Sequence, residues 1–100
     1  MSADDLGFAP PTFKPDEALS RLRRELRDMG LAEREGVFER RGLAIARVRI
    51  DGAALAAAIV ERPSRAGPRW RDRNLNDNAA VRDFSAELKK ALASWGNRDD

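Results

Sequence analysis

Residues 43–62 read LAIARVRIDGAALAAAIVER, and this stretch decides the fold. Its first part, residues 43–50, is rich in β-branched residues and leucine, which is typical of a β-strand. The dipeptide Asp51-Gly52 follows and is a strong signal for a type I′ hairpin turn. We therefore interpret the alanine-rich residues 54–62 as the next strand, bounded by Pro63. The same alanines would also suit a helix capped by Asp51, but the turn favours the strand.

One more strand precedes this stretch. Residues 37–41 have strand character, and Gly42 comes directly after them, where it can make a tight turn into residues 43–50. Strands that follow one another through such short turns pair as an antiparallel meander. The middle of the chain is therefore expected to be a small antiparallel sheet of two or three strands.

An amphipathic helix is predicted over residues 15–29. Pro15 suits the first turn of a helix, where a missing N–H costs nothing. Gly30 can supply the left-handed residue that ends many helices, with Leu31 folding back onto Leu26. The apolar residues of this segment recur at steps of three and four, as one helical face requires: Leu19, Leu22, Leu26 and Met29.

A second helix is predicted after the sheet. Asn76 or Asp77 can cap it, and it is expected to run to about Trp95 and to stop at Gly96. Its apolar face repeats with the same helical period at Val81, Phe84, Leu88, Leu92 and Trp95.

These elements predict an α+β domain over residues 15–96 with the order α-β-β-(β)-α. A small antiparallel meander with two helices packed on one face would bury both apolar stripes together. The expected core contains Leu19, Leu22, Leu26, Ile45, Val48, Phe84, Leu88 and Leu92. Residues 97–100 are expected to be a frayed tail.

Residues 1–14 are expected to be disordered or loosely packed, because Pro10 and Pro11 break regular structure. Two phenylalanines are unusual in a solvated tail. We expect either Phe8 or Phe13 to pack on the edge of the domain; the alternative is a short docking peptide.

Composition excludes several kinds of chemistry. The sequence has no cysteine and no histidine, so disulfides, thiolate nucleophiles and Cys/His zinc sites are impossible, and the usual neutral-pH general base is missing. Ser85 and Lys89 have the spacing of neighbours on one helix face, which we interpret as surface rather than as a catalytic pair. We therefore expect no enzyme, no cofactor, no metal and no small-molecule ligand.

The chain is expected to be cytoplasmic and away from membranes, because neither a signal peptide nor a spanning segment is recognisable. Its 16 arginines, against 3 lysines, and its many alanines fit a GC-rich, bacterial genome. The formal net charge of +2 gives no general attraction to polyanions. Any functional charge must therefore be local.

One basic cluster stands out, in residues 62–73, and we expect residues 63–74 to be a loop because of Pro63, Gly67 and Pro68. Three interpretations remain open for its tryptophan and arginines: a core plug with solvated arginines, a grip on an acidic protein surface, or phosphate contacts with base stacking. Two further arginines, Arg47 and Arg49, share one face of their strand. The candidate interaction residues are Arg62, Arg65, Arg69, Trp70, Arg71, Arg73, Arg47 and Arg49.

The favoured hypothesis is a small non-catalytic accessory or adaptor domain that binds a protein partner or forms a homodimer. An open sheet, an edge strand that can pair and the arginine-tryptophan cluster support it. The alternative hypothesis is a nucleic-acid-binding accessory protein that uses the cluster.

Overall fold

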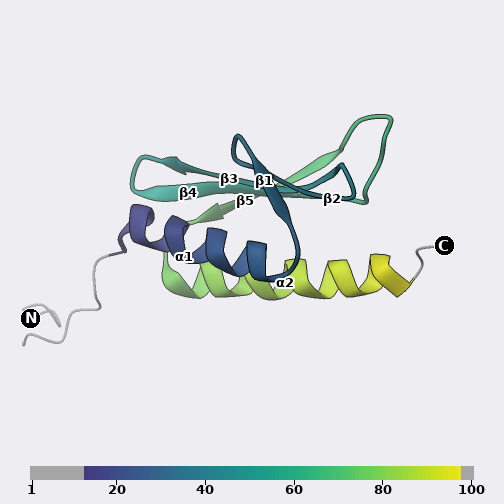
Figure 1. Cartoon of the computed structure of the whole chain (residues 1–100). Helices are drawn as coiled ribbons and strands as arrows, with labels where there is room; N and C mark the ends of the chain where they lie inside the picture. Colours follow the sequence, from purple (N-terminus) through teal and green to yellow (C-terminus); the bar gives the residue numbers. More distant parts are fainter. Residues whose placement is uncertain (1–12, 98–100) are drawn as a thin grey trace, which may run out of the picture.

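The computed structural model describes residues 13–97, which form two helices and a five-stranded sheet (Figure 1). Helix α1 comes first, a meander of five strands follows, and helix α2 comes last. The element bounds are α1 Pro15–Asp28, β1 Ala32–Arg34, β2 Val37–Arg40, β3 Leu43–Asp51, β4 Ala54–Val60, β5 Trp70–Leu75 and α2 Asn78–Asn97.

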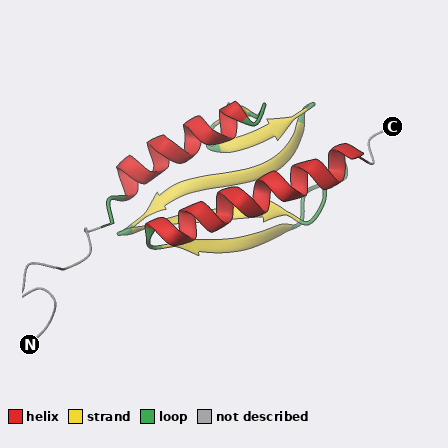
Figure 2. Ribbon diagram, turned by 90° about the horizontal axis from the view of Figure 1, so that it is seen from below, coloured by secondary structure: helices red, strands yellow, loops and turns green. Residues whose placement is uncertain are grey.

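The sheet has the order β1-β2-β3-β4-β5, and each strand pairs antiparallel with its neighbour in sequence. Both helices cover the same face, side by side, as the view from below shows (Figure 2). The predicted α+β meander with two helices on one face is therefore confirmed. Residues 54–60 are a strand, so the strand interpretation of that alanine-rich run is also confirmed.

Two strands were not expected. The three-residue β1 comes soon after α1, and β5 overlaps residues 70–74 of the predicted loop and ends at Leu75. The loop prediction is therefore wrong for residues 70–74; only residues 61–69 connect β4 to β5. The segment WRDRNL lacks the apolar alternation that marks a strand, because as an edge strand it exposes most of its side chains.

The turns follow the predicted chemistry with one correction. Between β2 and β3, Arg41 and Gly42 both have positive φ, 57° and 79°, as a type I′ turn requires. Between β3 and β4, however, the register pairs Asp51 with Ala54, so the central residues are Gly52 and Ala53. Only Gly52 has positive φ, 64°, which is typical of a type II′ turn.

The end of α1 and the start of α2 also match the expected caps. Leu31 N–H donates to the Leu26 carbonyl at 3.2 Å around Gly30, whose φ is 91°. Asp77 Oδ1 accepts a 2.7 Å hydrogen bond from the Ala80 N–H, so Asp77 is the cap of α2. The predicted stop at Gly96 is wrong, because α2 continues through it to Asn97.

The core lies between the sheet and the helices. Seven of the eight expected core residues belong to it, and the eighth, Leu19, is half-buried and packs against it. Ile45 and Val48 are three apart and would point to opposite faces of a regular strand. They are both buried because the β2–β3 register shifts between Phe38 and Glu39, which inserts an extra residue at Ile45. Phe13 packs against this core as expected, whereas Phe8 lies outside the described residues.

Candidate functional site

The sheet face opposite the helices, which we call the open face, has no helix of the described chain over it (Figure 1). Partners in an antiparallel register lie on the same face. Arg47 on β3 is the partner of Ala58 on β4, and Ala58 is the partner of Asp72 on β5. The register therefore places side chains from three strands in one row across the open face.

Arg47 and Trp70 contact each other on this face. The Arg47 guanidinium carbon lies 4.4 Å from the centroid of the Trp70 ring, which is a cation–π contact. Arg47 Nη2 also lies 3.6 Å from Asp72 Oδ1. Between them Ala58 is only 1% exposed although no helix covers it. Because the β4 residue is an alanine, the arginine can cross it to reach β5.

A shallow hollow of about 290 Å³ lies beside this stack. Its apolar lining includes Val37 from β2 and Ala56 from β4, and its charged lining is Arg47, Arg49, Glu35 and Asp72. Arg49 is exposed and forms no ion pair within residues 13–97. The predicted open-face position of Arg47 and Arg49 is confirmed, and Arg49 keeps its hydrogen-bond donors available.

The predicted arginine cluster is divided by strand geometry. In β5, Trp70 and Asp72 lie on the open face, whereas Arg71 and Arg73 alternate to the helix side. Trp70 is half-buried and lies outside the core beneath the helices. An interpretation of this segment as a loop could not predict which side chains share a face. Interpreting WRDRNL as a strand, in which successive side chains point to opposite faces, would have predicted it.

Arg73 belongs to a structural contact with α2. Its Nη2 and Nε donate to Glu87 Oε2 and Oε1 at 2.7 Å and 3.1 Å, and its Nη1 donates to the Asp72 carbonyl at 3.0 Å. The hydrogen bond to Glu87 is the main cause that raises the pKa of Arg73, and the nearby negative charge adds to it. A similar pair, Arg23 Nη2 with Glu33 Oε1 at 2.9 Å, joins α1 to β1.

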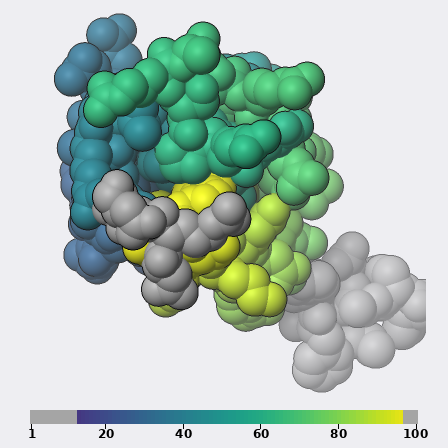
Figure 3. Space-filling view, turned by 90° about the vertical axis from the view of Figure 1, so that its right-hand side faces the viewer, coloured from purple at the N-terminus to yellow at the C-terminus, as the bar shows by residue number. Residues whose placement is uncertain are grey.

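The remaining arginines of the cluster lie in the 61–69 loop at one end of the sheet, which we call the basic end. Arg62, Arg65 and Arg69 are exposed there and form no ion pair within the described part of the chain. Figure 3 looks onto this end, where the green loop lies above the yellow C-terminal part of α2.

The basic end contains a pocket of about 590 Å³, which we call the end pocket. Its apolar lining comes from Leu43 and Ile45 on β3, Pro63 in the loop and Trp95 on α2. Its charged lining is Arg40, Arg41, Arg62 and Glu61. Sequence reasoning missed Arg40, Arg41 and Trp95, because they meet the loop only through the folding of the hairpin and α2.

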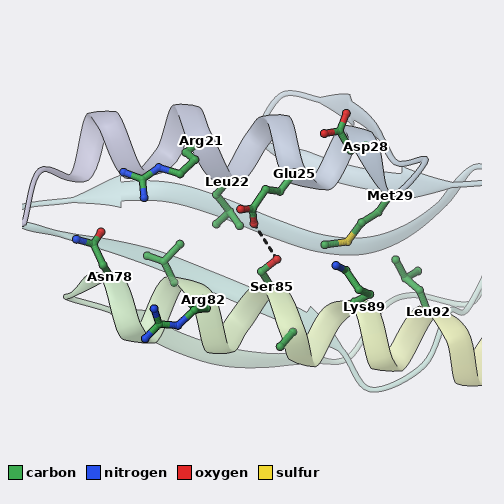
Figure 4. A pocket seen from close by; sticks show the side chains of 12 residues that line it. Arg21, Leu22, Glu25, Asp28, Met29, Asn78, Arg82, Ser85, Lys89 and Leu92 are labelled. Carbon is green, nitrogen blue, oxygen red and sulfur yellow. Dashed lines mark hydrogen bonds between the residues drawn. The ribbon is translucent and has the colours of Figure 1, made fainter.

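A longer groove of about 740 Å³ runs between α1 and α2 (Figure 4). Ser85 Oγ donates a 2.8 Å hydrogen bond to Glu25 Oε1 across it, and Leu22 and Met29 point into it from α1. Ser85 is 9% exposed, so the interpretation of Ser85 as a surface residue is wrong. Ser85 can bond to Glu25 because the packing of both apolar stripes on the sheet places the two residues at the contact between α1 and α2.

Residues 13–97 contain no group of three or more acidic side chains that could hold a metal ion. No helix in this range has the length and apolar character needed to cross a membrane. No protein-family model matches the sequence, and no curated protein or solved structure shows significant similarity to it.

Proposed function

We propose that this chain is a non-catalytic accessory or adaptor domain that binds a protein partner through its open face. The Arg47–Trp70 stack carries the proposal. Tryptophan and arginine are the residue types most enriched among interface hot spots. Here they already hold each other on a face that neither α1 nor α2 covers, so binding would cost little side-chain entropy.

The charges of this region favour an acidic partner surface. Arg49 on the open face and Arg62, Arg65 and Arg69 at the neighbouring end have no ion-pair partner within the described residues. Complementary negative charge on a partner would accelerate association and fix its orientation. The partner class that fits is therefore a protein with an acidic, partly apolar surface.

Pairing of β5 with a second copy of itself is disfavoured by charge. In an antiparallel pair, partner residues lie on the same face of the sheet. The two registers that would pair the most residues of β5 with a second copy are therefore centred on Asp72 or on Arg73. The first places Asp72 against its own copy and Arg71 against Arg73, and the second places Arg73 against its own copy. A different protein is therefore the favoured partner over a homodimer built on this edge, and light scattering at high concentration should give the mass of a monomer.

The exposed loop arginines favour the nucleic-acid alternative, but the state of Trp70 argues against it. Arg47 covers one face of the indole, where a base would stack. If four arginines nevertheless engaged a single strand, the logarithm of affinity would fall with the logarithm of salt with a slope of about −3. A flat titration at low salt with single- and double-stranded DNA and RNA would remove this alternative.

Site-specific photo-crosslinking in the source cells tests the proposed function. We expect a photoreactive residue at position 49 to give a discrete protein adduct that survives nuclease treatment and is lost with Arg47→Ser. The matched control is position 24, an exposed site on α1, which should give no such adduct. Equal adducts from both positions, or an adduct destroyed by nuclease, would contradict the proposal.

A further inference from the structure

The end pocket combines an apolar floor with a cationic rim. Ile45 is buried at its base, while the side chains of Leu43 and Trp95 are half-buried and line its wall. Its volume of about 590 Å³ lies within the usual range of about 300–1,000 Å³ for ligand pockets. An apolar group could be buried there without displacing the sheet or α2.

The rim determines the charge of what enters. Arg40 and Arg62 line the pocket, and Glu61 is the one acid of its lining among residues 13–97. The two arginines come from different elements, β2 and the start of the 61–69 loop, so their charges converge only in the fold. An apolar group that enters between these arginines would bind best if negative charges on both sides of it could pair with them.

The pocket lies next along the chain to the proposed partner surface. Trp70 on the open face is the register partner of Val60, the last residue of β4, and the first two loop residues after it, Glu61 and Arg62, line the pocket. Glu61 N–H donates to the Arg69 carbonyl at 2.9 Å, which holds the base of the loop together. A partner segment that binds the open face and runs toward this end of the sheet would therefore reach the pocket.

We propose that the end pocket binds one large apolar side chain of the partner, flanked on both sides by acidic residues. The inference rests on the proposed function for the acidic character of the partner. It adds the recognition element: a short acidic segment with one aromatic or aliphatic residue at its centre.

A synthetic peptide tests the pocket without the partner. The probe is acetyl-Gly-Asp-Glu-Phe-Glu-Asp-Gly-amide, and the control peptide carries serine in place of phenylalanine. In full-length Trp70→Phe protein, Trp95 is the single tryptophan and reports on the pocket by fluorescence. Because this background alters the open face and not the pocket, a negative result here is separate from a negative crosslinking result there.

We expect the phenylalanine peptide to shift Trp95 emission and to bind at least about tenfold more tightly than the serine peptide, as burial of a phenylalanine side chain predicts. Arg62→Gln on the rim should weaken binding about fivefold, whereas Arg65→Gln, in the same loop but outside the pocket lining, should change it less than twofold.

Three results would overturn the proposal. Equal binding of the two peptides would mean that the apolar floor is not used. Equal losses from Arg62→Gln and Arg65→Gln would mean diffuse attraction to any polyanion. Binding only after truncation behind residue 97 would mean that the acidic residues Asp99 and Asp100 of the chain itself, and not a partner, belong to the basic end.

Discussion

A double-mutant cycle on Arg47 and Trp70 tests the geometry of the open face. Arg47→Met and Trp70→Leu keep apolar mass above β4 while removing the charge and the ring. The Arg47 side chain is 47% exposed, and cation–π contacts at exposed sites contribute about 0.5–1 kcal/mol. We expect a coupling energy in this range between the two single changes.

The same cycle with Asp72 provides the comparison. The Arg47–Asp72 pair is longer, at 3.6 Å, and the Asp72 side chain is 86% exposed. Such surface pairs contribute from about 0 to 1 kcal/mol, and this geometry places it at the low end. The coupling of Arg47 with Trp70 should therefore exceed its coupling with Asp72.

Urea unfolding followed by circular dichroism measures both cycles, because the signal does not depend on the tryptophan that is removed. Arg49→Met is the matched control, since Arg49 lies on the same face but forms no ion pair within residues 13–97; it should leave stability unchanged. A coupling between Arg47 and Trp70 that is indistinguishable from zero would refute the argument that the stack is preformed.

Three further predictions concern the core, the contact between the helices and the contact between β5 and α2. Ser85→Ala should lower the free energy of unfolding by about 1 kcal/mol in urea unfolding, whereas Ser94→Ala at an exposed site of α2 should not. Leu88→Ala should cost about 2–5 kcal/mol and the half-buried Leu19→Ala less than half of that; similar costs would contradict the burial difference. The pKa of Arg73 is raised in the folded chain. The stability that its charge contributes to the fold is therefore fully present below the ordinary arginine pKa and is lost only as the pH passes the raised pKa. Arg73→Lys should therefore fall further behind the wild type between about pH 9 and 11, as a lysine with a pKa near 10.4 loses its charge, and urea midpoints at pH 7, 9 and 10.5 measure the gap.

The sequence predicted those elements whose pattern comes from burial. The stripe containing Leu22 and Leu26 packs against the core, so its period follows that of a helix. The run around Ile59 is buried on both faces, which leaves only its turns to indicate a strand. These features could be predicted because each depends on which side chains of a short local segment are buried.

The elements that sequence reasoning missed are those whose polar groups find partners far along the chain. The charged side chains of β5 have ion-pair partners in other elements. Arg73 pairs with Glu87 on α2, and Asp72 pairs with Arg47 on β3. Nothing within residues 70–75 indicates either partner. For the same reason the candidate site could be predicted only as a list of arginines, because its division between two faces follows from a strand that was expected to be a loop.

The two helices are joined across a long separation, which has a consequence for the order of folding. Every strand pairs with its neighbour in sequence, so the sheet can form through short loop closures. The Glu25–Ser85 hydrogen bond instead joins residues 60 positions apart. We expect strand amides to become protected before the helix pair forms, and Ser85→Ala to accelerate unfolding more than it slows refolding, which stopped-flow kinetics measure.

A nascent chain would then carry α1 and the complete sheet while the place of α2 is still empty. The apolar side chains that α2 covers, such as Leu75 beside β4, would be exposed to water and to other chains during that interval. The arrival of α2 therefore both completes the core and ends the period in which the chain is most prone to aggregate.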